Sequence, residues 1–410
     1  MTSPSLPPSP SKPTPAQGTP WEVGTAFLKL GLTSFGGPIA HLGYFHREFV
    51  VRRRWLDEDH FAQLLALCQF LPGPASSQLG FSIGLLRAGW LGAIAAFIAF
   101  ALPSALLLFA FGELSHLLTG PWGQSVIHGL KLVAVAVVAQ GVLAMARTLA
   151  PDMPRALMAA IAAGLIAINP ASIMQLAVVV GGAVLGPWLC KTVTSRQGET
   201  FPLHYARRTG ATLIATYAAL LLLAFTLAPE LPPLAQIAAA FYRTGSLVFG
   251  GGHVVLPLLK QAVVAPGWVS NDAFLAGYGA AQAVPGPMFT VAAFLGEQSQ
   301  GGRGGAPGAT ISLLAIFLPG LLLVSGVLPF WRTLASRNQA ARMLAGVNAA
   351  VVGLLAAALY NPVWISAVHD GKDFAIALVA FTLLVAARWS ALSVVAWCVI
   401  ASMARLFVGV

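Results

Sequence analysis

Apolar stretches long enough to cross a lipid bilayer follow one another along almost the whole chain after residue 20. A helix rises about 1.5 Å per residue, so about 20 apolar residues cross the roughly 30 Å of bilayer hydrocarbon. Thirteen such segments lie near residues 25–45, 60–84, 88–112, 127–147, 155–170, 171–190, 209–228, 237–258, 271–297, 306–328, 343–361, 373–387 and 390–409. Charged residues form 9% of the 410 residues, too few to cover a soluble surface. The pattern predicts an all-α integral membrane protein.

The net charge of +10 comes from basic residues in the short gaps between the apolar segments. Lys and Arg in such gaps are what the positive-inside rule expects of cytoplasmic loops. We therefore expect the lipid bilayer, and no nucleic acid, as a partner. Residues 1–20 are rich in Pro, Ser and Thr and lack the basic start and apolar core of a secretory signal, so we expect a disordered tail.

The three cysteines, Cys68, Cys190 and Cys398, are far apart and show no Cys/His ligand spacing. We expect no disulfide framework, no metal site and no cofactor. A Gly-x-x-x-x-Gly-Lys-Ser/Thr motif does not occur, which argues against an ATP-driven pump. No nucleophile is recognisable at the motifs described below, so we predict no catalytic residue and a protein that is not an enzyme.

The chain contains an internal repeat. Phe35–Pro38 is echoed by Phe249–Gly252, and Trp55–Pro74 is echoed by Trp268–Pro287 at nearly the same offset. Seven of the twenty positions in the longer alignment are identical. Self-similarity of this length predicts two copies of one structural unit.

The charges around the motifs predict that the two copies face opposite sides of the membrane. The gap after the first motif carries Arg47 and three arginines at 52–54, whereas the equivalent gap carries only Lys260. The next gap reverses the bias, because residues 113–127 contain no Lys or Arg and residues 329–342 contain three arginines. We expect a cytoplasmic N-terminus and a periplasmic C-terminus in the cell inner membrane.

Inverted-topology repeats are a signature of secondary transporters, whose substrate sites lie near the membrane midplane. We expect a first membrane repeat at 21–190 and a second, inverted repeat at 236–410. Residues 191–235 form a basic cytoplasmic loop and the linker helix that inverts the second copy.

Pro72–Pro74 and Pro285–Pro287 are Pro-Gly-Pro triplets inside apolar segments, where proline should break a helix. A re-entrant hairpin that enters and leaves on one face fits the charges. Kinked full spans remain the alternative, because membrane helices tolerate proline where neighbours satisfy the backbone.

A helix that begins inside the membrane presents free N–H groups and a positive dipole end, which suit an anion. Lys29 and Arg243 stand seven residues before equivalent glycines and supply paired positive charge, unless they snorkel to the interface. Gln69 and Gln282 precede the two triplets and could orient the loop or donate to substrate. The expected substrate-binding residues are Lys29, Gly36, Gly37, Pro38, Gln69, Pro72, Gly73, Pro74, Arg243, Gly250, Gly251, Gly252, Gln282, Pro285, Gly286 and Pro287.

Other polar residues near the motifs have two interpretations. His41 and His253 are either packing residues or proton carriers, and packing is favoured. Asp59 and Asp272 are equivalent in the two copies, and an N-terminal helix cap is favoured over proton coupling.

The motifs together resemble the chromate ion transporter family in its long, two-domain form, over roughly residues 22–410. They are Leu30–Pro38, Trp55 with Leu71–Pro74, Gln78–Gly80, Phe249–His253 and Val284–Pro287. The resemblance implies a carrier that exports chromate across the cytoplasmic membrane and confers chromate resistance, with sulfate as an analogue. It adds Gln78 and His253 to the expected substrate-binding residues.

Two other functions remain open from the sequence. One is uptake or exchange of sulfate or another oxyanion, and the other is a membrane-embedded enzyme or lipid carrier. The Gly181–Gly186 stripe suits close helix packing, either in a homodimer or within one chain.

Overall fold

The computed structural model describes residues 18–35, 37–115, 120–169, 171–194, 201–226, 230–249, 255–299 and 304–406. Every regular element in these ranges is helical, which confirms the predicted all-α class. The first part contains α1 (Pro20–Thr33), α2 (Gly37–Phe45), α3 (Glu58–Phe70), α4 (Ala75–Ser115), α5 (Pro121–Leu149), α6 (Met153–Ile168), α7 (Ser172–Leu189) and α8 (Arg207–Thr226). The second part contains α9 (Pro233–Leu247), α10 (Val255–Leu259), α11 (Asn271–Ala283), α12 (Val291–Gln298), α13 (Gly305–Val327), α14 (Trp331–Ala335), α15 (Asn338–Ala358), α16 (Ile365–Ala367), α17 (Gly371–Val385) and α18 (Ala391–Ala404).

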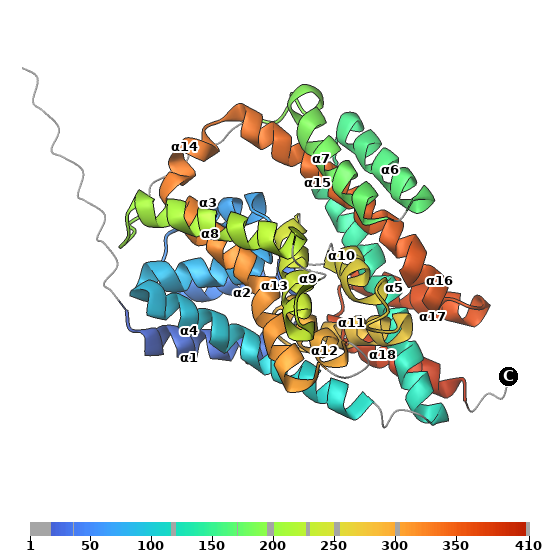
Figure 1. The fold of residues 1–410 in the computed structure, drawn as a ribbon. Coiled ribbons are helices and arrows are strands. Elements are labelled where there is room, and N and C mark those ends of the chain that lie inside the picture. Colours follow the sequence, from blue (N-terminus) through green and yellow to red (C-terminus); the bar gives the residue numbers. More distant parts are fainter. Residues whose placement is uncertain are drawn as a thin grey trace, which may run out of the picture.

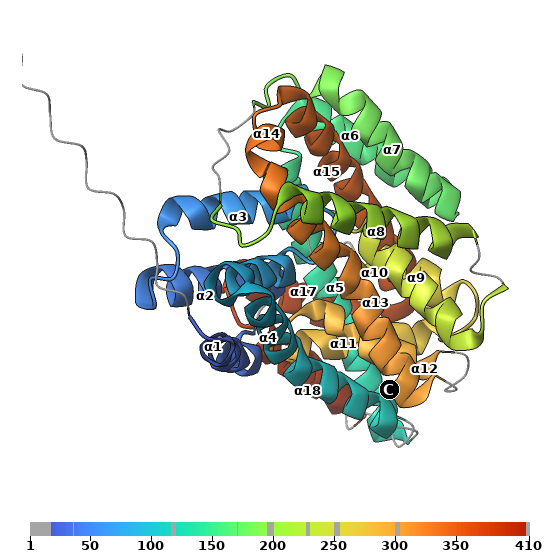
Figure 2. The ribbon, with the colours of Figure 1, turned by 60° about the vertical axis from the view of Figure 1, so that its left-hand side comes forward.

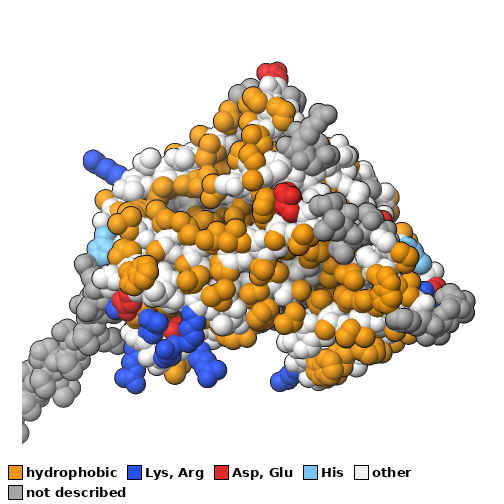
Figure 3. Space-filling model, turned by 90° about the horizontal axis from the view of Figure 1, so that it is seen from below, with side chains coloured by type: hydrophobic (Ala, Val, Ile, Leu, Met, Phe, Trp, Pro, Cys, Tyr) orange, Lys and Arg blue, Asp and Glu red, His pale blue; other side chains and the backbone are white. Residues whose placement is uncertain are grey.

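Five helical segments among the described residues are long and apolar enough to cross a membrane: 75–115, 121–149, 207–226, 305–335 and 338–367. Large apolar side chains such as Leu91, Ile161 and Ile400 are exposed. Figure 3 shows hydrophobic side chains over most of the face it presents, with basic side chains gathered at one corner. A bilayer accommodates such a surface and water does not, so the chain is a multi-pass membrane protein. The count of thirteen membrane segments stays a prediction.

Helices of the two parts pack in equivalent pairs. α1 lies against α4, and α9 lies against α13. α5 packs against α17 and α18, while α15 packs against α6 and α7, as Figures 1 and 2 show for the group of α6, α7 and α15. α5 of the first part therefore packs on two helices of the second part, and α15 of the second part packs on two helices of the first. This exchange joins the two parts.

The Gly181–Gly186 stripe is used inside this chain. A Cβ atom on Gly182 would stand 2.6 Å from the backbone oxygen of Gly346 on α15. Because only a glycine allows helices to approach this closely, the stripe serves the α7–α15 contact. A homodimer stays a prediction without support from this stripe.

The segment named α4 bends sharply in its first third. Ala88 and Gly89 are not helical, and Gly89 has φ +64°. Residues 75–87 and 90–115 are thus two helices that fold back on each other. The first of them is the partner of α3 in a hairpin, and the second is a long apolar helix.

A cluster of aromatic rings holds α1 to α2, to the residues that follow α2 and to the second helix of α4. Phe27 stacks on Phe49 with ring centroids 4.8 Å apart, and Phe49 stacks on Trp55 at the same distance. Phe45 contacts Phe27 and Phe100 edge to face. These rings are buried, and aromatic pairs of this geometry add about 0.5–1.5 kcal/mol each beyond their burial.

We expect Phe27→Ala to destabilise the protein by about 3–5 kcal/mol, because it removes the ring that three other rings contact. The neighbouring Leu28 is 43% exposed, so Leu28→Ala is the matched control and should change little. The apparent melting temperature of each purified variant in detergent measures the effect. Equal shifts for both variants would contradict this account of the core.

Candidate functional site

Each of the four Gly/Pro motifs lies where a helix stops. Among the described residues, α1 ends at Thr33, α3 at Phe70, α9 at Leu247 and α11 at Ala283, so a helix ends just ahead of each motif. The breaks that the prolines and glycines predict are therefore present. Entry and exit of each hairpin on one face of the membrane stays a prediction.

Two backbone hydrogen bonds join the breaks across the two parts of the chain. The N–H of Gly73 donates to the carbonyl of Val248 at 2.7 Å, and the N–H of Gly286 donates to the carbonyl of Ser34 at 2.9 Å. Gly73 and Gly286 are equivalent positions of the repeat, and so are Ser34 and Val248. The two bonds are thus the same contact made twice, each between a Pro-Gly-Pro triplet and the first break of the other part.

Gly73 and Gly286 must be glycines for two reasons. Their φ angles are +121° and +100°, a region that residues with a side chain rarely adopt. A Cβ atom would also stand 2.9 Å from the Cα of Gly320 at the first site and 2.8 Å from Oγ of Ser104 at the second. Both triplets are therefore pressed against a long helix, α13 or α4.

Buried polar atoms surround the breaks without full hydrogen bonding. Gln78 is fully buried and its Nε2 donates to the carbonyls of Pro72 (2.9 Å) and Gly320 (3.1 Å). Ser34 Oγ, Ser77 Oγ, His41 Nδ1 and Gln78 Oε1 have no partner among the described residues. An unpaired buried polar group costs about 1–3 kcal/mol, so these atoms favour a polar ligand or water. Hydroxyl donors of this kind suit an oxyanion.

The two glutamines ahead of the triplets behave differently. Gln69 is exposed, whereas Gln282 is buried and its Nε2 lies 3.0 Å from the sulfur of Met288. Gln282 is placed to hold the chain on both sides of its break together. Gln69 makes no such contact in the structure.

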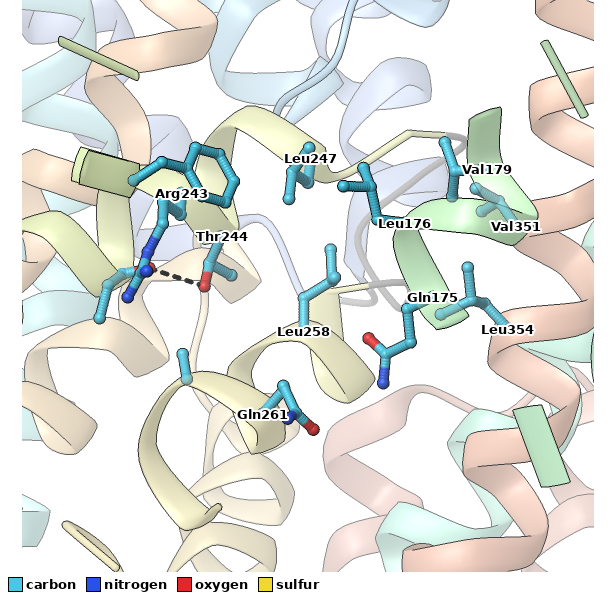
Figure 4. Close-up of a pocket in the computed structure, with 13 residues that line it drawn as sticks. Gln175, Leu176, Val179, Arg243, Thr244, Leu247, Leu258, Gln261, Val351 and Leu354 are labelled. Atoms are coloured by element: carbon cyan, nitrogen blue, oxygen red, sulfur yellow. Dashed lines mark hydrogen bonds between the residues drawn. The ribbon is translucent and has the colours of Figure 1, made fainter. Parts of the chain in front are cut away.

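Arg243 lines a cavity of about 360 Å³ between α9, α10, α7 and α15. Figure 4 shows Arg243 and Thr244 on one side of this cavity and Gln175 on another. The guanidinium lies 5.7 Å from the ring centre of Phe225 on α8, and no carboxylate of the described residues forms a salt bridge with it. Arg243 stands five residues before Val248, about 7.5 Å along the helix axis. A cation without a counter-ion next to a helix break is suited to an anion.

Lys29 does not share that cavity. Its side chain is exposed on α1, and it is not among the residues that line the space around Arg243. The two cations are therefore equivalent in sequence but differ in their surroundings.

Several expected site residues lie outside the described residues. These are Gly36, Gly250, Gly251, Gly252 and His253. Gly37 begins α2 with φ +75°, and the prolines at 72, 74, 285 and 287 lie in the two triplets described above.

The capping interpretation of Asp59 and Asp272 is wrong. The caps are Asp57, which accepts from the N–H of His60, and Ser270, which accepts from the N–H of Ala273. A cap must lie just before the first helical residue, and Asp59 and Asp272 lie inside the first turn.

Asp272 instead forms an ion pair that the sequence pattern did not predict. Its carboxylate lies 2.5 Å from Nζ of Lys131, a residue 8% exposed in the apolar middle of α5. The sequence feature that indicates a buried ion pair is Lys131 itself, a single lysine within an apolar run that continues to Val138. The pair holds the start of α11, which leads to the second triplet, on the long helix α5.

The fold and the joined helix breaks define a multi-pass helical membrane protein with irregular backbone between its helices. The chain belongs to the chromate transporter family, whose family model matches residues 21–187 and 235–405. This membership supports a chromate transport function.

Curated relatives agree with this assignment. A probable chromate transport protein of Synechococcus elongatus is 30% identical over 363 residues, which cover 86% of this chain and 87% of the relative. The chromate transport protein of Cupriavidus metallidurans is 28% identical, with 81% and 80% covered. That of Pseudomonas aeruginosa is 26% identical, with 81% and 78% covered. No solved structure matches the chain significantly.

We expect Gly286→Ala to destabilise the protein by about 1–3 kcal/mol and to impair transport, because alanine is strained at this φ angle and contacts Ser104. Gly164 on α6 has open space around its Cα, so Gly164→Ala is the control and should be neutral. Melting temperature and chromate uptake measure both variants. A neutral Gly286→Ala would show that the close contact is dispensable.

The ion pair predicts an asymmetric response to mutation. Asp272→Asn should cost about 1–3 kcal/mol, because it leaves the buried Lys131 charge without its partner, while the exposed side of the pair is screened by solvent. Lys131→Met should cost less, since the Asp272 side chain is 70% exposed and stays hydrated. The double variant should recover much of the stability of Asp272→Asn. Additive losses in thermal denaturation would exclude the pairing.

Proposed function

We propose that this protein is a secondary transporter that exports chromate, a tetrahedral dianion, across the cytoplasmic membrane and thereby confers chromate resistance. The observation that carries the proposal is the pair of equivalent hydrogen bonds, Gly73 to Val248 and Gly286 to Ser34, which brings helix breaks of both parts together. Irregular backbone at membrane depth is tolerated where it lines a cavity or is buried in protein. A substrate path between the parts accounts for such breaks in equivalent places.

The groups near the breaks match the needs of an oxyanion. Arg243 supplies a positive charge that no carboxylate of the described residues neutralises. Ser77 and Gln78 lie in the first turn after the first triplet, where the N–H groups and the helix dipole favour negative charge. We propose that chromate passes between these groups, with Lys29 attracting anions at the exposed face of α1.

We also propose that the repeats at 21–190 and 236–410 have inverted topology, with the N-terminus in the cytoplasm. The equivalent pairs α1–α4 and α9–α13 and the reciprocal packing of α5 and α15 support this arrangement. α8 is then the linker helix in residues 191–235, and it packs on α9 and α13.

An inside-negative membrane potential favours export of a dianion. Each charge that moves through 100 mV contributes about 2.3 kcal/mol, so a dianion gains about 4–5 kcal/mol. The chain carries no phosphate-binding loop motif for ATP. The electrochemical gradient is therefore the proposed energy source, and no enzymatic activity is needed.

The test is uptake of radiolabelled chromate into inside-out membrane vesicles under an imposed potential, with sulfate as competitor. We expect Arg243→Ala to lower uptake efficiency about tenfold or more, because a hydrogen bond to a charged group contributes about 1.5–3 kcal/mol. Lys372→Ala is the control, since Lys372 is an exposed cation at the start of α17.

Loss of uptake in Arg243→Ala alone, at equal protein level, supports a cationic oxyanion site. Unchanged uptake in this variant removes Arg243 from the site. No chromate uptake by the wild type under both a potential and a pH gradient would overturn the proposed function.

A further inference from the structure

Glu297, near the end of α12, is a buried carboxyl group that the proposed anion path does not use. It is 4% exposed, and its Oε2 is fully buried without a hydrogen-bond partner among the described residues. Oε1 has only a long contact, 3.5 Å from Nε2 of the neighbouring Gln298. No other carboxyl oxygen is among the buried unpaired atoms of the described residues.

The helices packed on α12 bring no positive charge to Glu297. They are α4, α11 and α13, and α13 contains no charged residue. Asp272 of α11 pairs with Lys131, and Arg87 of α4 pairs with Glu22. Among the described residues, the charged group that acts on Glu297 is Glu113, a second carboxylate, at the end of α4.

These surroundings favour the neutral form of Glu297. Burying an ionised carboxylate without a cation costs several kcal/mol, and a neighbouring like charge adds to the cost. A bound proton removes both penalties. The structure therefore shows a carboxyl group packed in the way that suits its protonated state.

The packing partner of the carboxyl group is the backbone of α4. A methyl group on Gly112 would overlap the Glu297 carboxyl group. Gln298 donates from Nε2 to the carbonyl of Gly112 at 3.3 Å. This contact closes the far end of α12 onto the long helix of the other part.

α12 also connects Glu297 to the second triplet. The chain passes from Pro287 through one short turn into α12, and the helix reaches Glu297 after about 10 Å. A rigid helix transmits a displacement from one end to the other. A change at Glu297 therefore reaches the break that bonds to Ser34.

We propose that Glu297 is a proton-binding site that couples oxyanion export to proton entry. When protonated, the carboxyl group packs on Gly112 and holds α12 against α4. When the proton leaves, the carboxylate and Glu113 repel each other and the carboxylate requires water, so α12 separates from α4 and the break at 285–287 opens. One proton is bound and released per cycle at this group, and no other bond changes. The inference rests on the proposed transport function.

The test separates coupling from transport. Purified protein in liposomes is assayed in two ways: exchange of labelled for unlabelled chromate at equal pH, and net uptake driven by an acidic lumen at constant external pH. Valinomycin with equal potassium on both sides clamps the potential. We expect the wild type to exchange chromate and to respond to the acidic lumen.

Glu297→Gln carries a neutral side chain of similar shape, so it should keep exchange and lose the response to the pH gradient. Glu113→Gln is the matched control, because Glu113 is exposed on the adjacent helix. It should keep the response with its midpoint at lower pH, since the repelling charge is gone. A full response in Glu297→Gln, or a wild type that exchanges chromate but ignores the pH gradient, would overturn the proton site. A wild type that neither exchanges nor accumulates chromate would overturn the transport function itself.

A second measurement needs only the wild type. Dicyclohexylcarbodiimide adds to a protonated carboxyl group in an apolar setting, and the adduct rearranges to a stable N-acylurea without a leaving group. Mass spectrometry should find the adduct on the peptide that contains Glu297, in greater yield at lower pH. Modification of Glu113 with Glu297 left free would count against the proposal even if Glu297→Gln fails to fold.

Discussion

The architecture depends on satisfying backbone groups where helices stop inside an apolar environment. In bilayer hydrocarbon no water replaces a missing hydrogen bond, so each interrupted helix needs a partner from elsewhere in the chain. Gly73 finds it at Val248 and Gly286 finds it at Ser34. Each bond joins the two parts of the chain, so neither part satisfies its own breaks alone. The need to satisfy these backbone groups also explains why the first triplet packs closely on α13 and the second on α4.

The two parts share a backbone plan but differ in side chains at equivalent places. Lys131 lies buried on α5, whereas α15 carries Asn348, whose Oδ1 is buried without a partner among the described residues. Arg243 lines a cavity, while Lys29 is exposed. The two parts therefore present different polar groups on similarly packed helices.

Sequence reasoning succeeded where the signal is local. The Pro-Gly-Pro triplets and the Gly-Gly motifs predicted where α1, α3, α9 and α11 end, because proline and glycine act on the backbone next to them. The apolar pattern predicted the all-helical membrane class, and the motif set led to the correct family. It failed on the caps, where Asp57 and Ser270 act instead of Asp59 and Asp272, because the exact first residue of a helix is not encoded in periodicity. The inverted topology and the assigned substrate-binding roles stay predictions.

The sequence by itself determined that this chain is a helical membrane protein, that helices end at four motifs, and that it belongs to a transporter family. Composition and local backbone chemistry decide these properties, and both can be read from the linear amino-acid sequence. Only the tertiary structure decided that Gly73 meets Val248, that Asp272 pairs with Lys131, and that Glu297 is buried on Gly112. Partners more than 100 positions apart are chosen by how helices cross and pack, and a residue's own neighbours in sequence carry no record of that choice.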